Sequence, residues 1–109
     1  MRNQCGIVVV AMLAASAGAV ASAEKGIEAK GKALVAANCS RCHAIGKDDK
    51  SPHREALPFR EVVLRYPPDQ LAEALAEGIM SGHPDMPEFT FEPAEIEAIV
   101  SYLGSLEVR

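Results

Sequence analysis

The sequence Cys-Ser-Arg-Cys-His at residues 39–43 constrains this chain more than any other feature. C-x-x-C-H is the pattern at which a c-type haem is attached covalently. Two cysteines three positions apart on one helical turn point the same way, so both thiols can form thioethers with the vinyl groups on one porphyrin edge. The next residue, His43, is then held below the ring with its imidazole directed at the iron. The motif predicts one haem c bound through Cys39, Cys42 and His43.

Three other kinds of site use similar spacings. A redox-active dithiol needs its C-x-x-C after a strand and at a helix start, where the helix dipole lowers the thiol pKa, whereas a helical pattern precedes Cys39. Zinc needs a fourth ligand, usually from a second C-x-x-C or an H-x-x-x-H pair, and the sequence has neither. A structural disulfide leaves His43 unexplained. Haem attachment is therefore the favoured interpretation.

Residues 1–23 have the three-part layout of a secretory signal peptide: a basic residue near the start, an apolar run and an Ala-Ser-Ala end. We expect cleavage after Ala23, which leaves residues 24–109 as one exported domain in the periplasm. Cys5 precedes the apolar run and leaves with the signal. A retained membrane anchor is the alternative, because residues 6–23 carry no charge and are nearly long enough to span a bilayer.

The mature chain is small, acidic and modest in apolar content. Residues 1–23 hold 16 of the 53 hydrophobic residues, so the mature chain has 37 in 86, about 43%, which is below the usual fraction. A haem would add the apolar surface that so short a peptide lacks. The mature chain has 10 Lys and Arg against 15 Asp and Glu, a net charge of −5. This balance argues against nucleic-acid binding.

Hydrophobic periodicity predicts an all-α mature chain. We expect an amphipathic helix over residues 24–38 and a loop over residues 44–60. A short helix over residues 59–66 should turn three side chains inward, namely Val62, Val63 and Tyr66.

Two further helices are predicted in the second half of the chain. The first opens at Pro68, ends near Gly78 and has its apolar residues at four-residue intervals, namely Leu71, Leu75 and Ile79. The second begins near Glu92, has Pro93 in its first turn and buries the stripe Ile96, Ile99, Val100 and Leu103. Prolines and glycine exclude regular structure between these helices.

A sixth iron ligand has three candidates, Met80, His83 and Met86. Met86 is favoured because it lies between Pro84 and Pro87 in an irregular loop, where a thioether can reach across a haem face. A His/Met pair is typical of electron-transfer haems. His83 would instead make a bis-histidine iron of lower potential, and an open sixth position would permit haem catalysis or binding of a small gas.

These residues resemble the small monohaem class I cytochromes c of bacteria. The resemblance covers the mature chain and includes residues 39–43, Met-Pro-Glu-Phe at 86–89 and the closing helical segment at 95–106. It implies a cytochrome c fold, with about three to five helices wrapped around one covalently bound haem. It also implies His43 as proximal ligand and Met86 as distal ligand. Crossing terminal helices should bring Gly31 against Tyr102, with Val35 and Ile99 beside them.

The chain departs from the family in three places. In relatives, a carbonyl before the second helical segment accepts the proton of the proximal imidazole, and here either Leu57 or Pro58 could provide it. Val35 replaces a larger aromatic residue at the helix crossing. The ring of lysines that docks partners in many relatives is not evident. Acidic residues instead follow the predicted distal ligand, namely Glu88, Glu92, Glu95 and Glu97.

The resemblance implies an electron-transfer protein and not an enzyme. We expect a monomeric periplasmic carrier that forms brief complexes with redox proteins bearing a basic patch. We expect it to bind no nucleic acid and, after cleavage of the signal peptide, not to insert stably into a membrane. The alternative is a dedicated haem c subunit of a larger periplasmic oxidoreductase. In that case Phe89 and Phe91 would be interface residues, whereas otherwise they pack on the porphyrin or the core.

Overall fold

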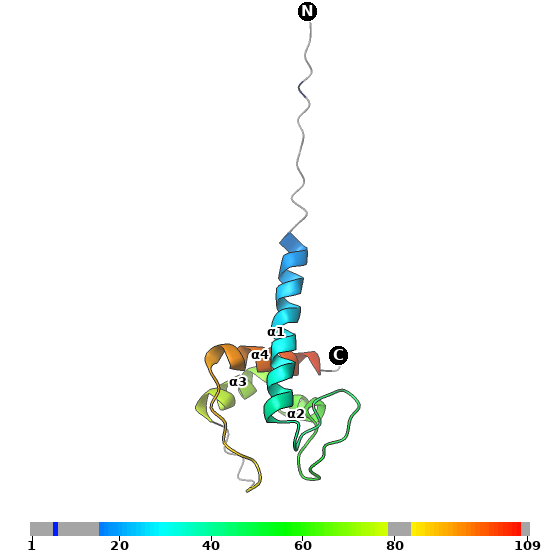
Figure 1. Cartoon of the computed structure of the whole chain (residues 1–109), viewed down its shortest axis with the longest axis vertical. Helices are drawn as coiled ribbons and strands as arrows, with labels where there is room; N and C mark the ends of the chain where they lie inside the picture. Colours follow the sequence, from blue (N-terminus) through cyan, green and yellow to red (C-terminus); the bar gives the residue numbers. More distant parts are fainter. Residues whose placement is uncertain (1–5, 7–15, 79–83, 108–109) are drawn as a thin grey trace, which may run out of the picture.

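The computed structural model describes residues 6, 16–78 and 84–107, and across these residues the chain is helical without strands. Four helices follow one another: α1 (Ser16–Asn38), α2 (Phe59–Arg65), α3 (Pro68–Glu77) and α4 (Pro93–Ser105). Figure 1 shows α4 crossing the lower half of α1, with α2 and α3 below the crossing. Both long loops lie at the end of the molecule where α1 ends. The all-α prediction is confirmed.

Helix α1 begins at Ser16, eight residues before the predicted start. The added turns are rich in alanine, which is the strongest helix former. The predicted cleavage after Ala23 lies within this helix and stays a prediction. Cleavage there would keep residues 24–38, which include the crossing with α4. Among the described residues, no helix combines the length and apolar character needed to cross a membrane.

The crossing of α1 and α4 is built around Gly31. A Cβ placed on this residue would lie 1.8 Å from the carbonyl oxygen of Ala98 and 3.0 Å from the Cβ of Tyr102. A hydrogen side chain is therefore what lets the two backbones approach so closely. Val35, one turn further along α1, is completely buried in a cluster with Ile99 and Tyr102. The packing of Gly31 against Tyr102 is confirmed.

The core is small and lies mainly on α4. Nine apolar residues are buried in the described chain: Val35, Ala44, Val63, Ile96, Ala98, Ile99, Tyr102, Leu103 and Leu106. The predicted stripe on α4 is correct except at Val100, which is only half-buried. The reason is that Ala98 and Tyr102 face α1, so the buried arc of α4 is rotated and Val100 lies at its margin.

Helix α2 differs from its prediction at one end. Val63 is buried and Val62 half-buried, but Tyr66 is 53% exposed, so the prediction that Tyr66 faces inward is wrong. Tyr66 has an extended backbone, with φ −129° and ψ 106°, because a residue before proline avoids the helical region. Its side chain therefore leaves the inward face of the helix.

Helices α3 and α4 begin and end close to where their prolines and glycine indicate. Helix α3 ends at Gly78, whose φ of 89° favours glycine. Ile79 lies outside the described residues. Glu92 precedes α4, and its backbone N–H donates to Oε1 of Glu95 at 2.9 Å. This bond satisfies a backbone donor at the start of the helix.

Candidate functional site

The C-x-x-C-H segment adds one helical turn to the end of α1. The backbone N–H of Cys39 donates to the carbonyl of Val35 at 2.8 Å, and that of His43 donates to the carbonyl of Cys39 at 2.9 Å. Both thiols are free and half-buried. The turn places Cys39, Cys42 and His43 on one continuous helical segment, as the attachment of a haem requires.

The state of the thiols disfavours the other uses of the motif. Burial raises the pKa of Cys39 to about 11, so this thiol is protonated at neutral pH, whereas a reactive dithiol needs a lowered pKa. Cys39 and Cys42 form no disulfide. Among the described residues, no group of three or more His, Cys, Asp or Glu side chains is arranged to hold a metal ion by itself.

The imidazole of His43 is oriented by a backbone carbonyl. Nδ1 of His43 donates to the carbonyl oxygen of Leu57 at 2.6 Å. Because a carbonyl can only accept, Nδ1 carries the proton and Nε2 keeps its lone pair for an iron ion. Leu57, and not Pro58, is therefore the residue that orients the imidazole. Such a bond fixes the ring and raises the basicity of the ligating nitrogen.

Phe59, the residue after Pro58, also contacts His43 and its neighbour Ala44. Its ring stacks on the imidazole of His43, with centroids 4.7 Å apart and planes inclined by 28°. Its backbone N–H donates to the carbonyl of Ala44 at 2.9 Å. Pro58, which has no N–H and a restricted φ, lies between Leu57 and Phe59. The Leu57 carbonyl bonds His43, and the Phe59 N–H bonds Ala44, the next residue of the chain. Sequence inspection did not find the role of Phe59.

The loop after His43 is held by side chains from elsewhere in the chain. The Tyr102 hydroxyl donates to the carbonyl of Ile45 and thereby ties α4 to this loop. Burial, followed by the nearby charges of Asp49 and Glu28, raises the pKa of Tyr102. The hydroxyl therefore stays protonated, and able to donate, throughout the neutral range. Tyr102 thus serves both the helix crossing and the motif loop.

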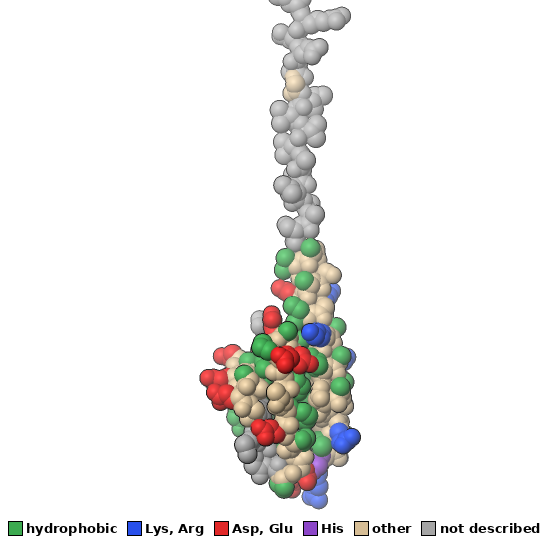
Figure 2. Space-filling model, turned by 60° about the vertical axis from the view of Figure 1, so that its left-hand side comes forward, with side chains coloured by type: hydrophobic (Ala, Val, Ile, Leu, Met, Phe, Trp, Pro, Cys, Tyr) green, Lys and Arg blue, Asp and Glu red, His purple; other side chains and the backbone are tan. Residues whose placement is uncertain are grey.

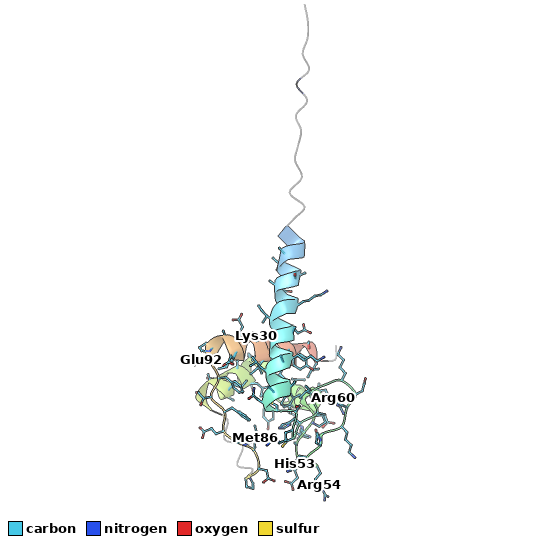
Figure 3. The ribbon with its side chains drawn as sticks, in the orientation of Figure 1. Lys30, His53, Arg54, Arg60, Met86 and Glu92 are labelled. Carbon is cyan, nitrogen blue, oxygen red and sulfur yellow. The ribbon has the colours of Figure 1, made fainter. Side chains whose placement is uncertain are left out.

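Met86 lies in the loop that leads into α4. Figure 3 shows it at the same end of the molecule as His53, which belongs to the loop after the motif. The Met86 side chain is half-buried and its neighbours Asp85 and Pro87 are exposed. The competing candidates Met80 and His83 lie outside the described residues. Met86 as distal ligand therefore stays a prediction.

Half-buried apolar side chains, two of them next to the motif, extend the buried core. Those packed against it are Leu34, Cys39, Ile45, Phe59, Leu71, Leu75 and Phe91. Phe89 stacks on Phe91 with ring centroids 5.7 Å apart. Both rings are half-buried, and Phe91 packs against the core as one of the two alternatives expected. Two free thiols on one helical segment and an imidazole whose Nδ1 is bonded to a carbonyl together fit a covalently attached haem c.

Charge divides the molecule into two parts. Residues 24–65 contain nine Lys and Arg and six Asp and Glu, whereas residues 66–107 contain nine Asp and Glu and no Lys or Arg. The second part comprises α3, the Met86 loop and α4. Figure 2 shows acidic side chains gathered on one side and Lys and Arg along the other side and the lower end. The acidic part is therefore the one that carries the predicted distal ligand.

Comparison with known proteins agrees with this site. The family model described as cytochrome C oxidase, cbb3-type, subunit III matches residues 27–103. The matched region contains the C-x-x-C-H motif, Met86 and most of α4. No curated protein and no solved structure matches the chain.

Proposed function

Because the chain belongs to the cytochrome c family, by its match to the cbb3-type oxidase subunit III model, we propose that it is a periplasmic monohaem carrier that shuttles single electrons through a His/Met-ligated iron. A cytochrome c domain supports electron transfer by a bound haem, and this family generally carries electrons and does not catalyse. The proposal adds the number of haems, the ligands, the compartment and the mode of exchange.

One observation carries the proposal most strongly: the hydrogen bond from His43 Nδ1 to the Leu57 carbonyl. It leaves Nε2 as the ligating atom, while Cys39 and Cys42 would hold the porphyrin edge. The haem supplies the one-electron iron couple. The chain supports the exchange by holding the imidazole in one orientation through Leu57 and Phe59. Met86 would be the second protein ligand of the iron and would favour its reduced state.

The ligand assignment is tested by Met86→Ala in the purified haem protein. We expect the wild type to show the methionine-to-iron charge-transfer band near the red end of the spectrum, and the variant to lose it. The reduction potential should fall by on the order of 100 mV, a fraction of the roughly 0.8 V range that axial ligands span. Met80→Leu and His83→Ala are the controls and should keep the band. Persistence of the band in Met86→Ala would refute the assignment.

The partner proposed for this carrier has a basic docking patch that faces the acidic part of the molecule. Long-range attraction between such patches raises the encounter rate and weakens as salt screens it. We expect electron transfer with the true partner to slow as ionic strength rises. At low salt, Glu88→Gln and Glu97→Gln should each reduce the rate about twofold, whereas Glu61→Gln on α2 should not. A rate that stays flat or rises with salt would contradict a basic partner.

The family description favours a second candidate, a dedicated haem c subunit of a larger oxidoreductase, since the matching model is described as an oxidase subunit. Phe89 and Phe91 would then lie at the subunit interface, which their half-buried, stacked rings permit. Size-exclusion chromatography of the native extract separates the two candidates. A free carrier elutes alone, whereas a subunit elutes with its catalytic partner.

A further inference from the structure

His53 contacts both segments that the proposed function places around the iron. Its backbone N–H donates to the carbonyl of Cys42 at 3.2 Å, so it is attached to the C-x-x-C-H turn. Its ring Nε2 lies 3.1 Å from Oδ2 of Asp85, the residue immediately before Met86. Figure 3 shows His53 and Met86 on neighbouring loops at the same end of the molecule. A single residue therefore connects the proximal and the distal segments.

The protonation pattern of His53 suits this connection. The backbone N–H of Glu55 donates to Nδ1 of His53 at 3.1 Å, so Nδ1 is the acceptor nitrogen of the ring. In the neutral imidazole the other nitrogen then carries the proton, and Nε2 donates to the Asp85 carboxylate. The Glu55 contact also restricts rotation of the ring and keeps Nε2 directed at Asp85.

We infer that His53 is a positioning residue, which holds the Met86 loop against the C-x-x-C-H segment and so keeps the Met86 thioether within reach of the iron. The inference rests on the proposed His/Met ligation. The His53 side chain is 28% exposed and that of Asp85 is 65% exposed, so solvent weakens the bond without removing it. The His53–Asp85 bond restrains one loop. Its loss should therefore make displacement of Met86 from the iron easier and should lower the free energy of unfolding of the whole domain less.

The experiment measures displacement of Met86 by free imidazole in the purified haem protein, followed through loss of the charge-transfer band. We expect His53→Ala and Asp85→Ala each to lower the half-displacing imidazole concentration by about threefold to tenfold, which is the range of one hydrogen bond to a charged group weakened by exposure. The double variant should fall short of the product of the two single effects, because the two residues are coupled through a shared bond. Asp85→Asn keeps an acceptor oxygen and should restore most of the wild-type value.

The matched control is Arg60→Ala. Arg60 also holds the loop after the motif, through a 2.6 Å bond from its guanidinium to the Asp49 carbonyl and an ion pair with the Asp49 carboxylate, and these contacts lie within that loop. It should leave imidazole displacement unchanged. If His53→Ala matches the wild type while Met86→Ala loses the band, the positioning role is refuted and the ligation stands. If Arg60→Ala acts as strongly as His53→Ala, general loosening of the loop replaces the specific role. If the wild type lacks the band, the His/Met ligation itself is refuted.

Discussion

Gly31→Ala is expected to lower the free energy of unfolding by about 3 kcal/mol, at the upper end of the cost of overpacking a core. The added methyl group would lie 1.8 Å from the Ala98 carbonyl oxygen, and a backbone atom cannot rotate away as a side chain can. The helices must separate, which also loosens Val35 and Tyr102 in the core. Thermal unfolding should show the midpoint falling by roughly 12–24 °C for a domain of this size.

Gly26→Ala is the matched control for this substitution. Gly26 lies in the same helix and a Cβ there would meet nothing within 4 Å. Because Gly26 would lie in the first turn of the helix after cleavage at Ala23, the substitution should change the free energy of unfolding by no more than about 0.5 kcal/mol. Equal behaviour of the two variants would show that the crossing tolerates a side chain at Gly31, and the packing described here would be wrong.

The double substitution Cys39→Ser and Cys42→Ser is expected to leave the protein without covalent haem and largely unfolded. Only nine apolar residues are buried in the described chain, and Val35 is the one large side chain among them with an exposed fraction below 2%. The half-buried apolar side chains that pack against this core add less stability than they would under a further apolar group. Far-UV circular dichroism should show most of the helical signal lost at room temperature.

Cys5→Ser controls for the general effect of removing a thiol. Because Cys5 lies in the predicted signal peptide, the mature protein should be identical to the wild type. Retention of full helical signal and an unchanged melting temperature in the double cysteine variant would contradict the role of the haem in folding. Loss of folding in Cys5→Ser would contradict its removal with the signal.

Much of the fold follows from local patterns in the sequence. Helices α3 and α4 start at prolines because proline restricts the backbone to a φ that suits the first turn of a helix. Helix α3 stops at Glu77, before Gly78, because glycine can adopt the positive φ that ends a helix. The burial of α4 could be predicted only in part. The apolar repeat of α4 predicts which residues form its buried stripe. Whether Val100 is fully buried depends on the position of α1 against α4, which is set by Gly31, a residue far away in the sequence.

The proximal half of the site was predictable, and its supports were predictable only in part. Residues 39–43 form a contiguous motif, so spacing alone indicates the chemistry. The Leu57 carbonyl was one of the two that the family resemblance offered, and the tertiary fold selects it. The Phe59 ring reaches His43, and the Tyr102 hydroxyl reaches the loop after the motif, through the tertiary fold, and no local pattern distinguishes these roles. Tyr66 shows the reverse case: helical period placed it inward, but the following proline changed its backbone. A check of the residue before each proline would have found this.

Covalent attachment of one haem through Cys39 and Cys42, in a chain that is exported, can be measured as the intact mass of the protein purified from the periplasm under denaturing conditions. We expect the mass of residues 24–109 plus one haem, with the haem retained after denaturation and traced to the peptide that holds residues 39–43. A mass equal to the polypeptide alone, with two thiols or a disulfide at Cys39 and Cys42, would contradict it.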